Sequence, residues 1–109
     1  MDGHITIDDF KKVEIKIGEI VSAEPIEGSD KLLKLKVNFG SEERQVLSGI
    51  KAYFPEPGVL VGKRCPFVTN LAPRSMMGLE SQAMILAVGG TDTLFALFET
   101  AGTPGDRVK

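Results

Sequence analysis

Apolar and polar residues alternate along several short stretches of this chain, which is the pattern of strands with one buried face. The clearest stretch is residues 33–39, where polar residues, among them Lys34 and Lys36, separate four apolar ones. The same test predicts further strands over residues 13–23, 43–48, 65–70, 81–88 and 94–98. Gly89 and Gly90, followed by a polar pair, predict a hairpin connection between the last two.

One short helix is predicted before the first strand. Thr6 is a favourable N-cap, and Asp8 and Asp9 follow in the first turn, where acidic side chains suit the helix dipole. Phe10 is expected to pack inward from this helix, and Gly18 suggests a bulge or a sharp bend in the first strand. Short strands with one small helix predict an all-β domain, either a closed or nearly closed barrel or a small sandwich.

The long excursion between two predicted strands, residues 70–84, is the most informative segment. Connections of this kind often carry function, because a rigid scaffold positions them. The excursion contains Arg74, the adjacent residues Met76 and Met77, and Gly78, which is expected to bend the backbone. The alternative is a surface loop that closes the barrel, with Met76 or Met77 filling gaps in the core.

Length and composition limit the class of protein. The 109 residues, 42% hydrophobic and 26% charged, fit one globular domain spanning residues 1–109, with its core in residues 7–109. The N-terminus lacks the features of a signal peptide, and the apolar runs are too short to span a bilayer. The single Cys, which cannot form an internal disulfide, fits the cytoplasm, and no membrane partner is expected.

The motifs of common catalytic sites are missing from the sequence. It contains no phosphate-binding glycine loop, no paired-cysteine metal motif and no candidate Ser-His-Asp set, and His4 is its only histidine. We therefore expect no enzyme activity, no cofactor and no metal site.

Charge is distributed unevenly along the chain. The net charge is −2, but residues 31–79 carry +5, between segments of −5 (1–30) and −2 (80–109). Lys34 and Lys36 recur at period 2, so they predict a basic stripe along one face of a strand that can follow a phosphate backbone. Arg44 and Arg74 are further candidate phosphate contacts. The alternative is that these side chains are only solvated.

Three motifs together resemble the tRNA-binding OB-fold module. They are Asp30-Lys-Leu-Leu, Arg44-Gln-Val-Leu-Ser-Gly-Ile, and the segment from Asn70 that reads Asn-Leu-Ala-Pro-Arg-Ser-Met-Met-Gly-Leu-Glu-Ser. The resemblance covers residues 7–109. The module occurs as free homodimers, as a C-terminal appendage of bacterial methionyl-tRNA synthetases and in synthetase-associated cofactors. The chain departs from the family pattern at Ser75 and Met77, where Lys and Arg are common.

The resemblance implies a five-stranded OB-fold barrel with a short N-terminal helix and extra C-terminal strands. It implies a non-catalytic domain that recognises folded tRNA by shape and phosphate contacts, as an appendage or beta subunit of methionyl-tRNA synthetase. A synthetase catalytic domain is therefore a possible partner. With no Trp, one Tyr and six Phe, the chain offers few platforms for base stacking, which agrees with recognition by shape. The expected tRNA-binding residues are Lys31, Lys34, Arg44, Asn70, Arg74, Ser75, Met76 and Ser81.

The last predicted strand is more apolar than one buried face requires. Strict alternation leaves two of Leu94, Phe95, Leu97 and Phe98 exposed in a monomer. In relatives this part of the chain helps to form a two-fold dimer, so these four residues are the expected interface of a homodimer. The alternative function is a chaperone-like or protein-interaction homodimer with little affinity for RNA, which the acidic net charge and the lost basic residues at Ser75 and Met77 favour.

Overall fold

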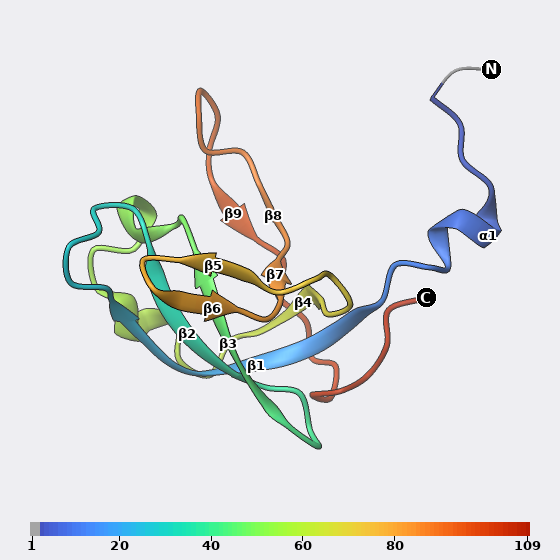
Figure 1. Ribbon diagram of the computed structural model, residues 1–109, viewed down its shortest axis with the longest axis horizontal. Coiled ribbons are helices and arrows are strands. Elements are labelled where there is room, and N and C mark those ends of the chain that lie inside the picture. The colour runs from blue at the N-terminus through green and yellow to red at the C-terminus, as the bar shows by residue number, and fades with distance from the viewer. Residues whose placement is uncertain (1–2) are drawn as a thin grey trace.

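A computed structural model describes residues 3–109 of the chain (Figure 1). Short strands predominate, as the alternation predicted, and α1 (Ile7–Phe10) is the single α-helix in this part. The strands are β1 (Ile15–Pro25), β2 (Leu33–Asn38), β3 (Glu43–Ser48), β4 (Arg64–Val68), β5 (Arg74–Met76), β6 (Leu79–Ser81), β7 (Met84–Ile85), β8 (Ala87–Val88) and β9 (Ala96–Leu97). Two 3₁₀ turns, η1 (Lys51–Tyr53) and η2 (Pro57–Leu60), lie between β3 and β4. None of the helices in residues 3–109 has the length and apolar character needed to cross a membrane.

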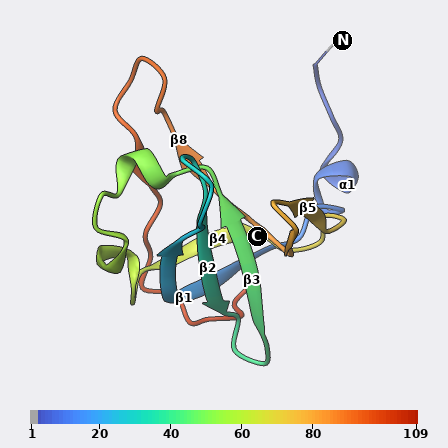
Figure 2. The ribbon, with the colours of Figure 1, turned by 60° about the vertical axis from the view of Figure 1, so that its left-hand side comes forward.

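One antiparallel sheet of five strands, in the order β3-β2-β1-β4-β7, forms the body of the molecule. The sheet curls strongly, so its inner face wraps around the core as a half-barrel (Figure 2). This confirms the all-β prediction and the OB-like architecture. β5 pairs with β6, and β8 with β9, as two separate hairpins outside this sheet.

The core lies on the concave side of the sheet, because the inward residues of β1, β2 and β4 are apolar. Leu33, Leu35 and Val37 are fully buried, while the lysines between them lie on the outer face. Phe67 of β4 is also fully buried and meets the ring of Phe39 edge-on, with centroids 5.4 Å apart. Each of these side chains contributes about 1.5–3 kcal/mol by its removal from water.

Gly18 permits a close crossing of strands. A Cβ built at this position would lie 2.4 Å from Cγ1 of Val37 and 2.7 Å from Cε1 of Phe39. The bulge that the sequence suggested at Gly18 lies elsewhere, because the register of β1 against β2 shifts between Ile20 and Ser22. Gly18 thus makes room for the core beneath β1 and is not itself the irregularity.

The N-terminal helix forms as predicted but does not pack as predicted. The Oγ of Thr6 accepts a hydrogen bond from the backbone N–H of Asp9 at 3.1 Å, which confirms the N-cap. Phe10 is 41% exposed, so the prediction that it packs inward was wrong. The reason is the position of α1, which precedes the N-terminal end of β1 and lies away from the sheet (Figure 1).

The predicted strand over residues 81–88 is divided among three elements. Ser81 ends β6, Met84 and Ile85 pair with β4, and Ala87 and Val88 pair with β9. The chain therefore leaves the half-barrel after Ile85 and forms a projecting hairpin (Figure 1). The predicted connection is present at its tip, where Gly89 and Gly90 both have positive φ angles.

Candidate nucleic-acid interface

The excursion that the sequence singled out is an ordered β-hairpin. β5 and β6 pair with Arg74 opposite Ser81 and Met76 opposite Leu79. The two-residue turn consists of Met77 (φ 53°) and Gly78 (φ 77°), which confirms the expected bend at Gly78. Positive φ at both positions is the geometry that joins two strands through two residues. The segment is therefore more regular than a loop.

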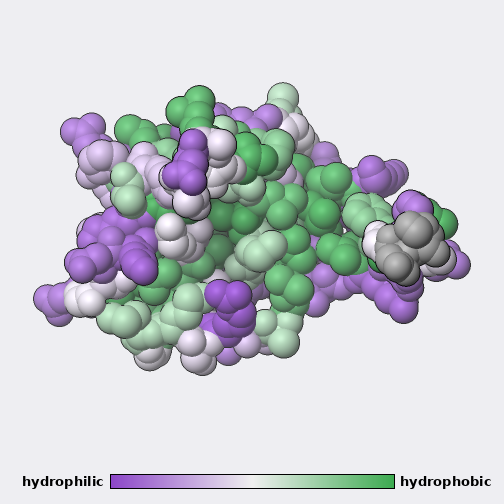
Figure 3. All heavy atoms as spheres, turned by 90° about the horizontal axis from the view of Figure 1, so that it is seen from above, coloured by the Kyte–Doolittle hydropathy of each residue, from purple (hydrophilic) through white to green (hydrophobic). Residues whose placement is uncertain are grey.

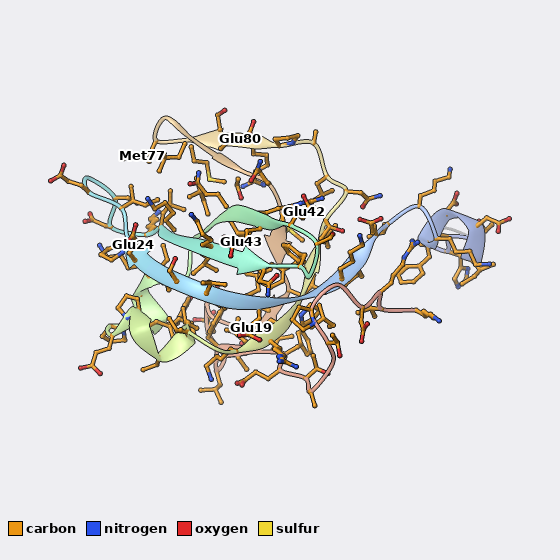
Figure 4. All side chains as sticks on the ribbon, turned by 90° about the horizontal axis from the view of Figure 1, so that it is seen from below. Glu19, Glu24, Glu42, Glu43, Met77 and Glu80 are labelled. Carbon is orange, nitrogen blue, oxygen red and sulfur yellow. The ribbon has the colours of Figure 1, made fainter. Side chains whose placement is uncertain are left out.

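The hairpin tip lies beside the turn between β1 and β2. A Cβ on Gly28 in that turn would lie 3.6 Å from Cε of Met77, so the Met77 side chain reaches across to the turn. Figure 4 shows Met77 at the end of the hairpin, close to the β1–β2 turn. The fold thereby brings two predicted segments together, the one that carries Arg74 and the one that carries Lys31.

Three of the predicted tRNA-binding side chains are engaged inside the fold. Ser81 is buried, and its Oγ accepts a hydrogen bond from the N–H of Leu47 at 3.0 Å. The amide of Asn70 joins β4 to the segment before β1, because its Oδ1 accepts from the N–H of Glu14 at 2.8 Å and its Nδ2 donates to the carbonyl of Lys12 at 2.6 Å.

Arg44 is the third of these internal contacts. Its Nη1 donates to the carbonyl of Thr69 at 2.6 Å, and its Nη2 lies 2.9 Å from Oε2 of Glu42. The hydrogen bond and the charge of this guanidinium hold the pKa of the Glu42 carboxyl below its usual range. Most of the polar capacity of Arg44 is therefore used within the protein.

In the folded protein, several cations of the basic segment form ion pairs with carboxylates of the two acidic segments. Within the basic segment, Lys34 Nζ lies 3.0 Å from Oε1 of Glu24 on the neighbouring strand, and Arg64 Nε lies 2.9 Å from Oε1 of Glu19. Lys63 pairs in the same way with Glu99 from the C-terminal segment. Antiparallel pairing thus places acidic residues of β1 beside cations of β2 and β4.

A few cations of residues 31–79 have no carboxylate partner within the described part of the chain: Lys31, Lys36, Lys51 and Arg74. Lys51 donates from Nζ to the carbonyl of Ser29 at 3.0 Å. Arg74 is exposed, and its one polar contact within residues 3–109 is a weak approach of Nη2 to Sδ of Met76 at 3.9 Å. Within residues 31–79, Lys31, Lys36 and Arg74 are thus the cations whose side chains have neither a carboxylate nor a backbone acceptor among the residues that the structure describes.

The remaining predicted site residues lie on the same hairpin. Ser75 is exposed and lies opposite Glu80 in the pairing, while Met76 is half-buried. Sequence analysis missed Gln45 and Gln82, whose side chains join this hairpin to β3. The only sequence signal for them is a polar amide within or beside a recognised motif.

Of the four residues of the predicted dimer interface, two are exposed and two pack against the protein, as alternation along a strand requires. Leu94 is 88% exposed and Phe98 is 47% exposed, whereas Leu97 packs against the core. The ring of Phe95 is stacked on that of Tyr53, with centroids 4.1 Å apart. Tyr53 is thereby covered on one face, so it is a poor platform for a nucleobase.

The curled sheet and its outer hairpin define the class, which is the small OB-fold module. The particular family follows from comparison with known proteins: residues 15–107 match a family model described as "Putative tRNA binding domain". The chain belongs to this tRNA-binding domain family.

Relatives of the chain include a much longer synthetase and solved chains that it covers almost completely. It is 49% identical over 98 residues to a methionine–tRNA ligase of Chlorobaculum tepidum, a match that covers 90% of this chain but only 14% of that protein. The structure superposes on a MetRS-related protein from Pyrococcus horikoshii with a TM-score of 0.91 at 37% identity, over 97% of this chain and 98% of the other. It also resembles the CsaA chaperone protein from Picrophilus torridus, with a TM-score of 0.86 at 26% identity over 97% and 100% of the two chains.

Proposed function

We propose that this domain acts as a non-catalytic, cytoplasmic tRNA-binding module that delivers tRNA to a methionyl-tRNA synthetase catalytic domain, either as an appendage or as a separate subunit. Membership of the family and the similarity to a methionine–tRNA ligase support this function. The observation that carries the proposal is the contact of the tip of the β5–β6 hairpin, at Met77, with the β1–β2 turn, because the hairpin carries Arg74 and the turn carries Lys31.

The direct contacts of the proposed surface are Lys31, Lys34, Arg74, Ser75 and Met76. An exposed guanidinium can bind a phosphate through two parallel hydrogen bonds, which suits Arg74. Lys34 can exchange its half-exposed partner Glu24 for a phosphate at little cost, since surface ion pairs contribute at most about 1 kcal/mol. Beneath them, Arg44, Asn70 and Ser81 shape the surface through their internal hydrogen bonds.

Recognition by shape and phosphates is the mode that this surface favours. Bases that bind by stacking need exposed aromatic faces. Of the seven aromatic residues, none lies in the β1–β2 turn or in the β5–β6 hairpin. A folded tRNA with its phosphates held by a few cations fits these side chains better than a single strand does.

We propose further that the domain works as a homodimer whose interface includes the β8–β9 hairpin. Leu94 and Phe98 lie outside the half-barrel and are exposed to solvent. Figure 3 shows the molecule from above relative to Figure 1, and hydrophobic residues cover much of the side that it shows. A second copy related by a two-fold axis would cover the same residues on both chains.

Titration of bulk tRNA at about 50 mM and about 200 mM salt tests the RNA-binding function. We expect measurable affinity at the lower concentration and a marked loss at the higher one, because phosphate contacts release counterions. Arg74→Ala should lower the slope of log affinity against log salt by about one unit. Lys12→Ala is the matched control, because it removes one exposed cation from the end of α1, and it should leave the slope unchanged.

The absence of tRNA binding at the lower salt concentration would exclude the RNA-binding function. It would favour the alternative, a chaperone-like or protein-interaction homodimer. Two observations favour this alternative function: the similarity to the CsaA chaperone protein and the exposed apolar residues of the β8–β9 hairpin.

A further inference from the structure

The β5–β6 hairpin is attached to β3 mainly by side chains. The two form separate sheets, and one backbone hydrogen bond joins them near the seam, from the N–H of Gln82 to the carbonyl of Gln45 at 2.8 Å. Beside it, Oε1 of Gln82 accepts from the N–H of Gln45 at 3.0 Å, and Nε2 of Gln45 donates to the carbonyl of Glu80 at 2.9 Å. We call Gln45 and Gln82 the glutamine clasp.

The glutamine clasp uses the only two glutamines of the chain. Gln45 is half-buried and Gln82 is exposed, so water can replace their hydrogen bonds if they break. The apolar core is formed by other residues of β1 to β4, β7 and the turns that follow β3. Other contacts with β3 remain when the clasp is lost: the N–H of Leu47 donates to Oγ of Ser81 at 3.0 Å, and Nη1 of Arg44 donates to the carbonyl of Gln82 at 3.3 Å. Loss of the clasp should therefore loosen the hairpin locally and leave the half-barrel folded.

The hairpin held by the glutamine clasp carries Arg74. Arg74 is directly opposite Ser81 in the β5–β6 pairing, and Ser81 precedes Gln82 in the chain. A shift of β6 along or away from β3 would therefore move Arg74 by a similar distance. It would also move Met77 away from the β1–β2 turn that carries Lys31.

We propose that the glutamine clasp is a positioning device for tRNA, which fixes the hairpin so that Arg74 and Lys31 meet the same RNA surface. This inference rests on the proposed function, because it names what holds the proposed surface in place. Gln45 and Gln82 need not touch RNA themselves. Their effect on tRNA affinity passes through Arg74.

Amide hydrogen exchange tests whether the clasp holds the hairpin, and it needs no RNA. Gln82→Met keeps the length of the side chain but removes the acceptor for the N–H of Gln45, whereas Gln82→Glu keeps an acceptor oxygen. With Gln82→Met we expect exchange in residues 74–82 to accelerate by up to about tenfold, the effect of losing one hydrogen bond. Exchange in β1 and β2 should not change, and Gln82→Glu should retain the protection of the hairpin.

A double-mutant cycle tests whether the clasp acts through Arg74. Gln82→Met should weaken tRNA binding by about fivefold when Arg74 is present, within the range for one lost hydrogen bond, and should add no further loss in the Arg74→Ala background. Asn38→Leu is a control, because it removes a side-chain acceptor from the β2–β3 turn and should leave tRNA affinity unchanged.

Two results would overturn the proposal. The first is unchanged exchange in the hairpin of the Gln82→Met protein, which would show that the clasp holds nothing. The second is an equal loss of tRNA affinity with and without Arg74, which would mean that Gln82 contacts RNA or acts elsewhere. If the unaltered protein bound no tRNA, the proposed function and this role for the clasp would both fail. The exchange measurement would still distinguish a released hairpin from a fixed one.

Discussion

Gly18 shows how a residue without a side chain can determine the shape of the half-barrel. The space that a Cβ would need is occupied by Val37 and Phe39, which are both buried. Val37 is β-branched and stiff, and the ring of Phe39 is held against Phe67, so neither can yield easily. The close approach of β1 to the core depends on this one glycine.

We predict that Gly18→Ala lowers the free energy of unfolding by about 1–3 kcal/mol, the usual cost of overpacking a core. Urea denaturation measures the change. Gly49→Ala is the matched control, because a Cβ there meets no atom within 4 Å and the backbone φ is not positive. Equal stability of the two variants would contradict the role assigned to Gly18.

Glu14 links stability to pH at the residue scale. The hydrogen bond from Oγ of Thr69 to Oε1 of Glu14, at 2.6 Å, is the main cause that holds the pKa of this carboxyl below its ordinary value of 4.5, and Lys16 adds to the effect. Because the pKa is lower in the folded protein than in the unfolded chain, the contribution to stability is complete above pH 4.5. It is lost as the pH falls through the folded pKa.

Glu14→Gln should therefore reduce stability at neutral pH, and the difference from the unaltered protein should shrink as the pH falls below about 4.5. Thermal unfolding at a series of pH values measures this difference. A constant difference across the series would show that the charge of Glu14 has no part in the effect.

At the scale of elements, alternation located the strands of the half-barrel, and the signal at Gly89 and Gly90 located the β8–β9 hairpin, but the β5–β6 hairpin was not predicted. β2 and β3 match their predicted ranges closely, since their inward residues face one continuous core. The β5–β6 hairpin gave no such signal, because its turn is Met77-Gly78 instead of the usual Asn-Gly or Asp-Gly. Residues 81–88 were predicted as one strand, but they are divided among three pairings: Ser81 pairs with β5, Met84 and Ile85 pair with β4, and Ala87 and Val88 pair with β9.

The sequence predicted the candidate residues of the site but not the hydrogen bonds that some of them form within the protein. The motifs identified Arg74 and Lys31 as candidates, and the turn signal at Gly78 was correct. The sequence could not show that Arg44, Asn70 and Ser81 donate or accept within the fold, since their partners are backbone groups far away in the chain. For the same reason, the glutamine clasp was invisible before the structure.

Met77 provides a test at the scale of the hairpin. A side chain with positive φ costs roughly 1–2 kcal/mol, but Asn tolerates this region better than other residues. Met77→Asn should slow amide exchange in residues 74–82, while Met77→Val, with a β-branched side chain, should accelerate it. The opposite order of the two variants would contradict the turn geometry.

At the scale of the whole molecule, apolar residues that the half-barrel does not bury are concentrated outside the sheet. They lie in the β8–β9 hairpin, where Leu94 is almost fully exposed, and in the segment around α1, where Ile5 and Ile7 are exposed. Where exposed apolar residues form a contiguous patch, the patch usually marks an interaction site. The proposed homodimer would cover the exposed apolar residues of the hairpin.

Light scattering at micromolar concentration should give twice the chain mass of 11.8 kDa. Leu94→Glu should shift the mass to that of one chain, because it places a charge in the proposed interface. Val59→Glu is the control, since Val59 is exposed on η2 and should leave the dimer intact. A single-chain mass for the unaltered protein would exclude the homodimer.

The buried thiol of Cys65 can report how often the half-barrel opens. Cys65 is fully buried in β4, and burial raises the pKa of its thiol to about 11. Thiol reagents attack the thiolate, so the folded protein should resist alkylation in two ways, through lack of access and through lack of thiolate. Because the chain has no other cysteine, the rate at which a reagent labels it measures how often the half-barrel opens. A released hairpin alone should leave that rate unchanged.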